Sequence, residues 1–224
     1  MNSNPRAKVI LCYGDSNTNG VKPDRSGRFS ASERWTGLLQ QRLGDNYYVI
    51  EEGLGGRTTD LDHYNPDKPS RNGLAYFKAC IDSHMPLDTV IIMLGSNDLK
   101  TMYDRTADDI AKALKLYIAY INKYCGDKNL PVPRVILVSP PYMNEDASRF
   151  TESMAQSGVY DAVSAQKSHE LAGPIHQLAD DEKCIFLDAG PITETGDDGL
   201  HLTQASHAEL ANRIAEFFTS PNSH

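Results

Sequence analysis

The sequence predicts an α/β fold in which one parallel β-sheet carries helices on both faces. Apolar runs alternate with helix-forming segments along all 224 residues, a pattern typical of parallel strands joined by crossover helices. The third run is apolar throughout, as in strands that are covered on both faces. Neither an internal repeat nor a linker interrupts the pattern, so we expect one domain over 1–224 with its core at about 8–219. The expected strands are 9–13, 47–51, 89–93, 135–138 and 184–187.

In the first part of the chain, the expected strand 9–13 ends at Gly14, which frees the backbone to turn before a polar segment. Residues 20–31 contain glycine, proline and several charges, and we expect a surface loop there. The segment Ser30–Glu33 has the spacing of a capping box, which predicts a helix over 34–43.

The middle part begins with a glycine-rich segment at 53–56, which marks a backbone that turns tightly or approaches another group closely. Residues 62–73 include prolines, an asparagine and a glycine and are expected to be irregular. A short helix at 74–83 precedes the third strand, and a longer helix at 107–124 follows it. The longer helix repeats apolar side chains on one face at helical spacing.

In the last part, residues 142–158 are expected to form a loop or lid, to which Phe150 and Met154 contribute apolar contacts. A helix over 159–179 follows and is expected to be disturbed where a proline falls inside it. The final helix begins near Thr203 and buries one apolar face.

Composition limits the classes of function. The formal net charge of −8 argues against non-specific binding to nucleic acid or to an anionic membrane surface. No segment approaches the roughly 20 apolar residues that a membrane-spanning helix needs. Residues 1–8 are polar and lack the apolar centre of a secretory signal, so we expect a cytoplasmic location. The cysteines are far apart in the sequence and are expected to be reduced and structural, with no zinc site: Cys12, Cys80, Cys125 and Cys184.

Polar residues follow three of the expected strands. Ser16 comes after the first strand, Gly56 after the second and Asn97 after the third, while Asp198 and His201 precede the last helix. The carboxyl ends of parallel strands meet at one edge of a sheet, where ligands bind in folds of this class. We therefore expect these residues to converge. Gly-Asp-Ser-Asn alone is equally typical of a plain polar turn.

The residue types match what acyl transfer needs. Ser16 is the candidate nucleophile, His201 the candidate base that takes its proton, and Asp198 the candidate carboxylate that orients the imidazole. A tetrahedral oxyanion needs preorganised donors. The N–H groups of Ser16 and Gly56 and the amide of Asn97 are the candidates for that role.

These residues resemble the SGNH hydrolases, also called the GDSL esterase family. The blocks that carry the resemblance are Gly14-Asp15-Ser16, Gly56, Gly95-Ser96-Asn97-Asp98 and Asp198-Gly199-Leu200-His201. Each block is short, but together, in this order, they are specific. The resemblance implies a flavodoxin-like three-layer α/β/α sandwich with strand order 2-1-3-4-5. It also implies ester hydrolysis that needs neither a metal nor another cofactor.

The neighbouring text looks most like the arylesterase and acyltransferase branch of that family: Arg34-Trp35-Thr36, Glu51-Glu52-Gly53-Leu54 and Val90–Gly95. That likeness implies a small-molecule ester with a short acyl chain, transfer of the acyl group to acceptors other than water, and a homo-oligomer. One departure is Asn17, which stands where the family has leucine. We expect the Asn17 side chain to face the substrate.

Other polar residues near the blocks have more ordinary interpretations. Asp15 is expected to bond the backbone around Ser16, and Asp98 to brace the Asn97 loop. Arg57 and Lys100 are interpreted as solvated charges rather than substrate ligands, and Trp35 as either pocket lining or core. The remaining histidines lack a carboxylate at the required spacing and are expected on the surface or on helix faces: His63, His84, His169, His176, His207 and, in the C-terminal tail, His224.

A binding module is the rival class, because sheets of this kind also hold flavin or act as signalling receivers. A phosphate site needs a glycine-rich turn that opens a helix after the first strand, and this turn has one glycine. A receiver needs an acidic cluster there, and only Asp15 is present. A family member without activity is a third alternative, against which the complete block set argues. The natural ester stays open between carbohydrate acetyl groups, aryl esters, lipids and thioesters.

Overall fold

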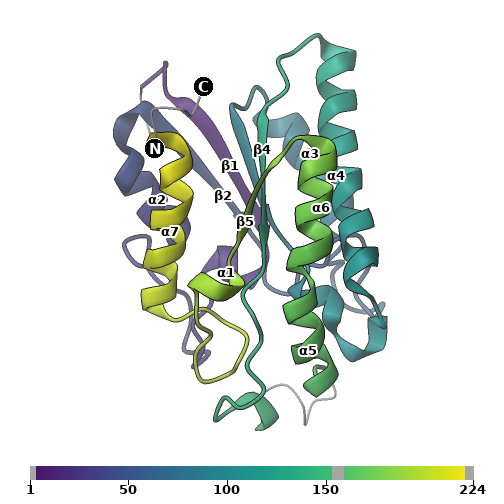
Figure 1. Ribbon diagram of the computed structural model, residues 1–224. Coiled ribbons are helices and arrows are strands. Elements are labelled where there is room, and N and C mark those ends of the chain that lie inside the picture. Colours follow the sequence, from purple (N-terminus) through teal and green to yellow (C-terminus); the bar gives the residue numbers. More distant parts are fainter. Residues whose placement is uncertain (1–3, 153–158, 220–224) are drawn as a thin grey trace.

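The computed structural model describes residues 4–152 and 159–219, in which five parallel strands form one sheet of order β2-β1-β3-β4-β5 (Figure 1). Both the α/β class and the 2-1-3-4-5 order are confirmed. The chain adds β2 on one side of β1 and then β3, β4 and β5 on the other, so the carboxyl edge of β1 and β3 is the topological switch point at which such folds bind ligands. The strands are β1 (Lys8–Gly14), β2 (Tyr47–Gly53), β3 (Thr89–Met93), β4 (Arg134–Ser139) and β5 (Ile185–Asp188).

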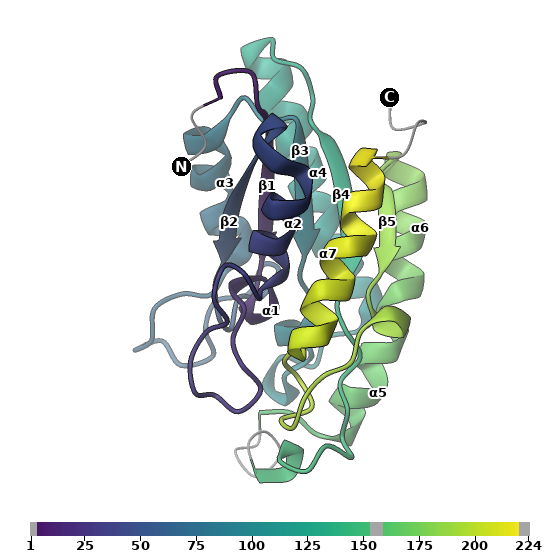
Figure 2. The ribbon, with the colours of Figure 1, turned by 90° about the vertical axis from the view of Figure 1, so that its left-hand side faces the viewer.

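Helices cover both faces of the sheet and give a three-layer arrangement (Figures 1 and 2). One face is covered by α2 (Trp35–Leu43) and α7 (Gln204–Thr219). The other face is covered by α3 (Gly73–His84), α4 (Ala107–Lys128) and α6 (Ala172–Glu182). A further helix, α5 (Ala162–Glu170), precedes α6. None of the described helices is both long enough and apolar enough to cross a membrane.

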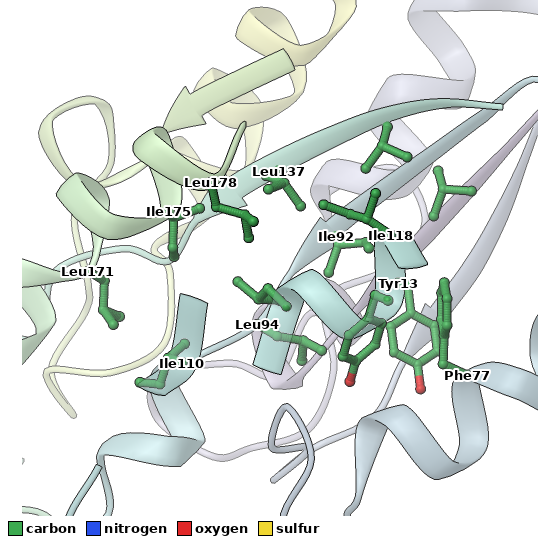
Figure 3. Close-up of a cluster of buried hydrophobic side chains, with 14 of the residues drawn as sticks. Tyr13, Phe77, Ile92, Leu94, Ile110, Ile118, Leu137, Leu171, Ile175 and Leu178 are labelled. Atoms are coloured by element: carbon green, nitrogen blue, oxygen red, sulfur yellow. The ribbon is translucent and has the colours of Figure 1, made fainter. Parts of the chain in front are cut away.

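The sheet residues divide between two apolar cores because successive side chains of a strand point to opposite faces. In β1, Leu11 and Tyr13 enter the core on the α3–α4 side, whereas Ile10 and Cys12 enter the core under α2 and α7. Figure 3 shows the first of these cores, in which Tyr13 lies beside Phe77. Core packing therefore holds β1 on both faces, up to the polar segment that directly follows the strand.

Helix α2 lies where the sequence predicts a helix, but Ser30–Glu33 does not cap it. Glu33 Oε2 accepts from the Ser30 N–H at 2.9 Å, as in a capping box, yet the Ser30 hydroxyl lies 2.9 Å from that of Ser32. The Ser30 carbonyl accepts from the N–H groups of Glu33 and Arg34, which closes a separate turn before the helix. True capping boxes occur instead at the start of α4, with Thr106 and Asp109, and of α5, with Asp161 and Ser164.

The single helix expected over 159–179 is two helices, α5 and α6, joined at Leu171. Pro174 lies in the first turn of α6, where its missing N–H breaks no intrahelical hydrogen bond. The break therefore comes before the proline. Of the apolar residues expected in the preceding lid, Phe150 is buried, and Met154 lies outside the described residues.

The four cysteines are free thiols. Cys12 lies within β1 as expected, while Cys184 immediately precedes β5 rather than forming part of it. Three of the four are buried, and burial raises the pKa of the Cys12 thiol well above its ordinary value. A buried, protonated thiol acts as a small apolar side chain, which is the structural role that the sequence predicts.

Candidate active site

A pocket of about 480 Å³ opens at the carboxyl edge of the sheet and brings the predicted site residues together. Ser16 enters it from the one-turn helix α1 (Ser16–Asn19), which directly follows β1. Gly56, Asn97 and His201 also line it, while Asp198 is fully buried behind His201. Its other lining residues are Val21, Arg25, Gly55, Lys100, Val159, Tyr160 and Leu200.

Asp198 and His201 form a direct pair. Asp198 Oδ2 lies 2.5 Å from His201 Nδ1, and Asp198 Oδ1 accepts from the N–H groups of Leu200 and His201 at 3.0 and 2.9 Å. Burial opposes ionisation of Asp198, but the hydrogen bond and charge of His201 outweigh it, so the pKa of the carboxyl lies below its usual value. The carboxylate is thus ionised and fixes the ring through Nδ1, which leaves Nε2 as the nitrogen available for proton transfer.

Ser16 is nearly buried and shares the pocket with the imidazole. Within residues 4–152 and 159–219, no hydrogen bond joins the Ser16 hydroxyl to His201. Hydrogen bonds between a nucleophile and its base are often long in unliganded enzymes and shorten when substrate binds. Ser16 and His201 therefore share the pocket without a direct hydrogen bond between their side chains in the described structure.

The Asn97 amide is held from both ends. Its Nδ2 donates to Asp15 Oδ2 at 3.2 Å, and its Oδ1 accepts from the Tyr160 hydroxyl at 3.1 Å. An amide nitrogen carries two hydrogens, so one remains for the pocket. Tyr160 is itself buried in the pocket wall, and no motif in the sequence distinguishes it.

Gly56 contributes backbone to the pocket from a tight turn after β2. Its φ of +79° is in the left-handed region that glycine favours. Directly beside it, Arg57 is buried rather than solvated as predicted. Its guanidinium lies 4.1 Å from the Tyr13 ring centroid and donates to the carbonyl of Gly14 at 2.8 Å. Arg57 thereby ties the Gly56 turn to the end of β1.

The prediction for Asn17 is wrong, because its side chain faces the His201 loop instead of the substrate. Asn17 Nδ2 donates to the Leu200 carbonyl at 3.2 Å, and Asn17 Oδ1 accepts from the Leu202 N–H at 2.9 Å. These bonds hold the residues on either side of His201. They are possible because the amide is both donor and acceptor, which leucine is not.

The supporting carboxylates act as the sequence predicts. Asp15 accepts from the Asn17 N–H at 2.9 Å, which holds the turn around Ser16. Asp98 accepts from the Thr59 N–H at 2.9 Å, linking the Asn97 loop to the segment after Gly56. Burial raises the pKa of Asp98 to about 7, although the hydrogen bonds from Thr59 lower it.

Three further residues with open or ordinary interpretations are buried or partly buried. Trp35, the first residue of α2, is buried in the core under α2 and α7 and is not among the residues that line the pocket. Lys100 lines the pocket and is partly buried, so its interpretation as a solvated surface charge is wrong. His207 is on a helix face as predicted, and its side chain is fully buried.

One group of potential metal ligands occurs in the described part of the chain, away from the pocket. The ligand atoms of Glu52, Cys80 and His84 lie within 4.8 Å of one another. Burial of Cys80 raises the pKa of its thiol to about 12, which disfavours the thiolate that a metal would require. His84 Nε2 lies 3.4 Å from Glu52 Oε1, so these two side chains contact each other within the group.

Comparison with known proteins agrees with this geometry. A model of the GDSL-like lipase/acylhydrolase family matches residues 12–209. The structure of the native M. smegmatis aryl esterase is similar at a TM-score of 0.84 and 39% identity, covering 96% of this chain and 99% of that one. Est24, a carbohydrate acetylesterase from Sinorhizobium meliloti, is similar at 0.84 and 37% identity, covering 95% and 99%. A search of curated protein sequences found no match.

Proposed function

The chain belongs to the GDSL-like lipase/acylhydrolase family and is a carboxylic ester hydrolase, and we propose that it acts as a serine esterase through Ser16, His201 and Asp198. The observation that carries the proposal is the buried Asp198–His201 pair facing the same pocket as Ser16. A carboxylate, an imidazole and a hydroxyl in this order are the parts of a nucleophilic acyl-transfer site.

In the first half-reaction, Ser16 Oγ attacks the ester carbonyl carbon while His201 Nε2 takes the hydroxyl proton. Asp198 stabilises the imidazolium that forms, because its carboxylate already accepts from Nδ1. The tetrahedral intermediate then collapses, and His201 returns the proton to the departing alkoxide. The products of this step are the free alcohol and an acyl ester on Ser16.

The negative oxygen of the intermediate is stabilised by donors that are in place before the reaction. We assign this role to the N–H groups of Ser16 and Gly56 and to Asn97 Nδ2. Ser16 is the first residue of α1, where N–H groups have no intrahelical acceptor. Tyr160 and Asp15 fix the Asn97 amide, so it need not reorient as charge develops.

In the second half-reaction, His201 removes a proton from an incoming molecule that attacks the acyl group on Ser16. Water as the acceptor gives hydrolysis, and an alcohol gives acyl transfer. We propose both, with acyl chains from acetyl to butyryl. The support is the likeness to an aryl esterase and to a carbohydrate acetylesterase. We also propose a homo-oligomer, which light scattering coupled to size-exclusion chromatography tests.

The test of the proposed machinery is steady-state hydrolysis of p-nitrophenyl acetate by three alanine variants. Ser16→Ala and His201→Ala are each expected to lose about 10⁴-fold or more in kcat, and Asp198→Ala less, because the carboxylate only orients and supports the imidazole. Ser83→Ala, an exposed helix serine, serves as the matched control and keeps full activity. Retained activity in His201→Ala would place the base elsewhere. Higher kcat/KM on the octanoate than on the acetate would refute the short-chain preference.

A further inference from the structure

Three cationic side chains from three separate loops meet around the pocket. Arg25 lies in the loop after α1 and Lys100 in the segment after Asn97, and both line the pocket. Arg71 comes from the segment before α3, and its Nε lies 3.6 Å from the position that a Cβ would occupy on Gly56. Arg25 and Lys100 therefore line the pocket in which the ester carbonyl binds in the proposed mechanism, and Arg71 lies beside its Gly56 wall.

Two of these cations have no carboxylate partner. In the described parts of the chain, Lys100 forms neither an ion pair nor a side-chain hydrogen bond, although it is partly buried. Arg71 donates to the carbonyls of Pro69 and Ser70 at 3.5 and 3.4 Å, and the described residues offer it no acidic partner. Burial lowers the pKa of the Lys100 ammonium, and the charges of Asp15 and Asp98 only partly oppose this effect.

Two arginines elsewhere in the chain form close ion pairs with a carboxylate. Arg34 lies 2.6 Å from Glu51, and Arg105 lies 2.7 Å from Asp60. At the pocket, the contact from Arg25 Nε to Asp198 is 3.9 Å, and Asp198 already accepts shorter bonds from the His201 loop. Among the described residues, the pocket lining therefore includes the cations Arg25 and Lys100 and no carboxylate, in a chain whose formal net charge is −8.

A structural role for Lys100 as counter-charge to Asp15 and Asp98 is the simpler alternative, because both carboxyls raise its pKa. Each of these carboxyls has its own donors. Asp15 accepts from the Asn17 N–H and from Asn97 Nδ2, and Asp98 accepts from the N–H and hydroxyl of Thr59. Neither carboxyl contacts the Lys100 ammonium within ion-pair distance in the described structure.

We infer that the site selects esters that carry a carboxylate beside the scissile ester group, bound by Lys100 with Arg71 and Arg25. This inference rests on the proposed esterase function and names its substrate class. A partly desolvated ammonium next to two guanidinium groups attracts a carboxylate more strongly than exposed surface charges do. The carboxylate belongs to the alcohol part, as in an acetylated hydroxy acid or acidic sugar, or to the acyl part, as in a half ester of a dicarboxylic acid.

The experiment compares kcat/KM for matched charged and neutral esters. In the alcohol arm, 4-acetoxybenzoate is compared with 4-acetoxybenzamide, and in the acyl arm, p-nitrophenyl hydrogen adipate with p-nitrophenyl hexanoate. The charged-to-neutral ratio cancels the general loss that any pocket substitution causes. We expect this ratio to exceed one in at least one arm, which identifies the part of the substrate that carries the charge. The ratio should also fall as sodium chloride is raised, because salt screens the attraction.

The variants are Lys100→Met and Arg71→Gln, which remove charge and keep much of the side-chain length. Each is expected to lower the ratio about tenfold, and Lys100→Glu to lower it further. The matched control is Lys112→Met, which removes a charge from the exposed surface of α4 and should leave the ratio unchanged. Thermal unfolding of each variant confirms that it is folded.

The outcomes separate the two proposals. If the neutral acetate 4-acetoxybenzamide is not hydrolysed in a manner that depends on Ser16, the proposed function fails. If they are hydrolysed but the ratio is one or less in both arms, the carboxylate preference is wrong. A ratio above one that Lys100→Met and Arg71→Gln leave unchanged would also overturn the assignment of these side chains.

Discussion

Asn17 joins the two halves of the proposed catalytic site at the level of single atoms. It follows the nucleophile on α1, and its amide bonds the Leu200 carbonyl and the Leu202 N–H, on either side of His201. Ser16 and His201 are far apart in the sequence. Asn17 connects them, because it directly follows Ser16 and bonds both neighbours of His201. Asn17 is thus a positioning residue, acting on the reaction through His201.

Asn17→Leu is expected to lower kcat about ten- to a hundredfold with a smaller effect on KM, because small misplacements of a base are costly. The informative measurement repeats the substitution in a His201→Ala background. There it should have no further effect on the residual rate, since the base it positions is gone. An equal loss in both backgrounds would show that Asn17 only stabilises the fold.

Asn97 lies at the proposed oxyanion site, with its amide held by Tyr160 and Asp15. Asn97→Ala is expected to lose about 10²–10³ in kcat with little change in KM, because the amide meets full negative charge only in the transition state. Tyr160→Phe removes only the bond that orients the amide and should cost less. A raised KM with kcat intact would make Asn97 a residue that binds the ground state.

Sequence motifs predicted which residues line the pocket but not how every side chain points. Ser16 was predictable because a short block marks the end of the first strand. His201 was predictable because another block marks the segment before the last helix. Tyr160 belongs to no block and reaches the pocket through chain folding, and Arg71, also outside the blocks, lies beside Gly56. Arg57 was misread because an arginine beside a glycine-rich turn is usually solvated, whereas here Tyr13 and a backbone carbonyl replace water.

At the scale of elements, the turn from Asp198 to His201 depends on Gly199. Its φ is +70°, and a Cβ there would lie 2.1 Å from the Asn144 carbonyl oxygen. Gly199→Ala should therefore destabilise the protein by about 2 kcal/mol or more and lower activity, because the Asp198–His201 pair moves.

The matched control is Gly126→Ala in α4, where a Cβ meets no atom within 4 Å. That substitution should stabilise the protein by about 0.5–1 kcal/mol with unchanged activity. Urea unfolding and hydrolysis rates measure both. Equal effects of the two substitutions would contradict the role of the left-handed turn.

Helices α2 and α7 meet through a buried histidine whose titration affects stability. His207 Nδ1 accepts from the Trp35 N–H at 3.3 Å, and burial lowers the His207 pKa from 6.5 to about 4. Between these values the unfolded chain holds a proton that the folded protein lacks, so this group makes stability rise with pH. The contribution lost as pH falls from 6.5 to 4 is about 3 kcal/mol.

His207→Asn keeps an acceptor near the position of Nδ1 and removes the titration. The difference in unfolding free energy between wild type and this variant should shrink by about 3 kcal/mol from pH 6.5 to pH 4. Denaturant unfolding at several pH values measures it, and the other titrating groups cancel in the difference. A difference that stays constant with pH would show that His207 does not titrate in this window.

Hydrophobic patterns predicted the strands and long helices because each buries a continuous or helically spaced apolar surface. They missed α1, which has only four polar residues and is defined by Asp15 bonding the Asn17 N–H. They predicted one helix, disturbed near Gly173 and Pro174, where α5 and α6 stand, because the break at Leu171 has no glycine or proline of its own.

At the scale of the whole molecule, alternation of strands and helices predicts one parallel sheet but does not order its strands. The 2-1-3-4-5 order came from the family resemblance, and it explains why residues after β1 and β3 share a pocket. Lys100 lies close in sequence to the Asn97 block, whereas the placement of Arg25 in the pocket lining and of Arg71 beside Gly56 depends on how their loops fold. The single domain over 1–224, the homo-oligomer and the cytoplasmic location stay predictions.

The central claim, that this fold presents Ser16 as a nucleophile activated by His201, is tested most directly by covalent labelling with a fluorophosphonate followed by peptide mass spectrometry. The account predicts that wild type gains one adduct, on Ser16, and that His201→Ala gains it far more slowly. Ser16→Ala should gain none, while the control Ser83→Ala is labelled like wild type. Labelling that persists in Ser16→Ala, or that maps to another residue in wild type, would contradict the claim.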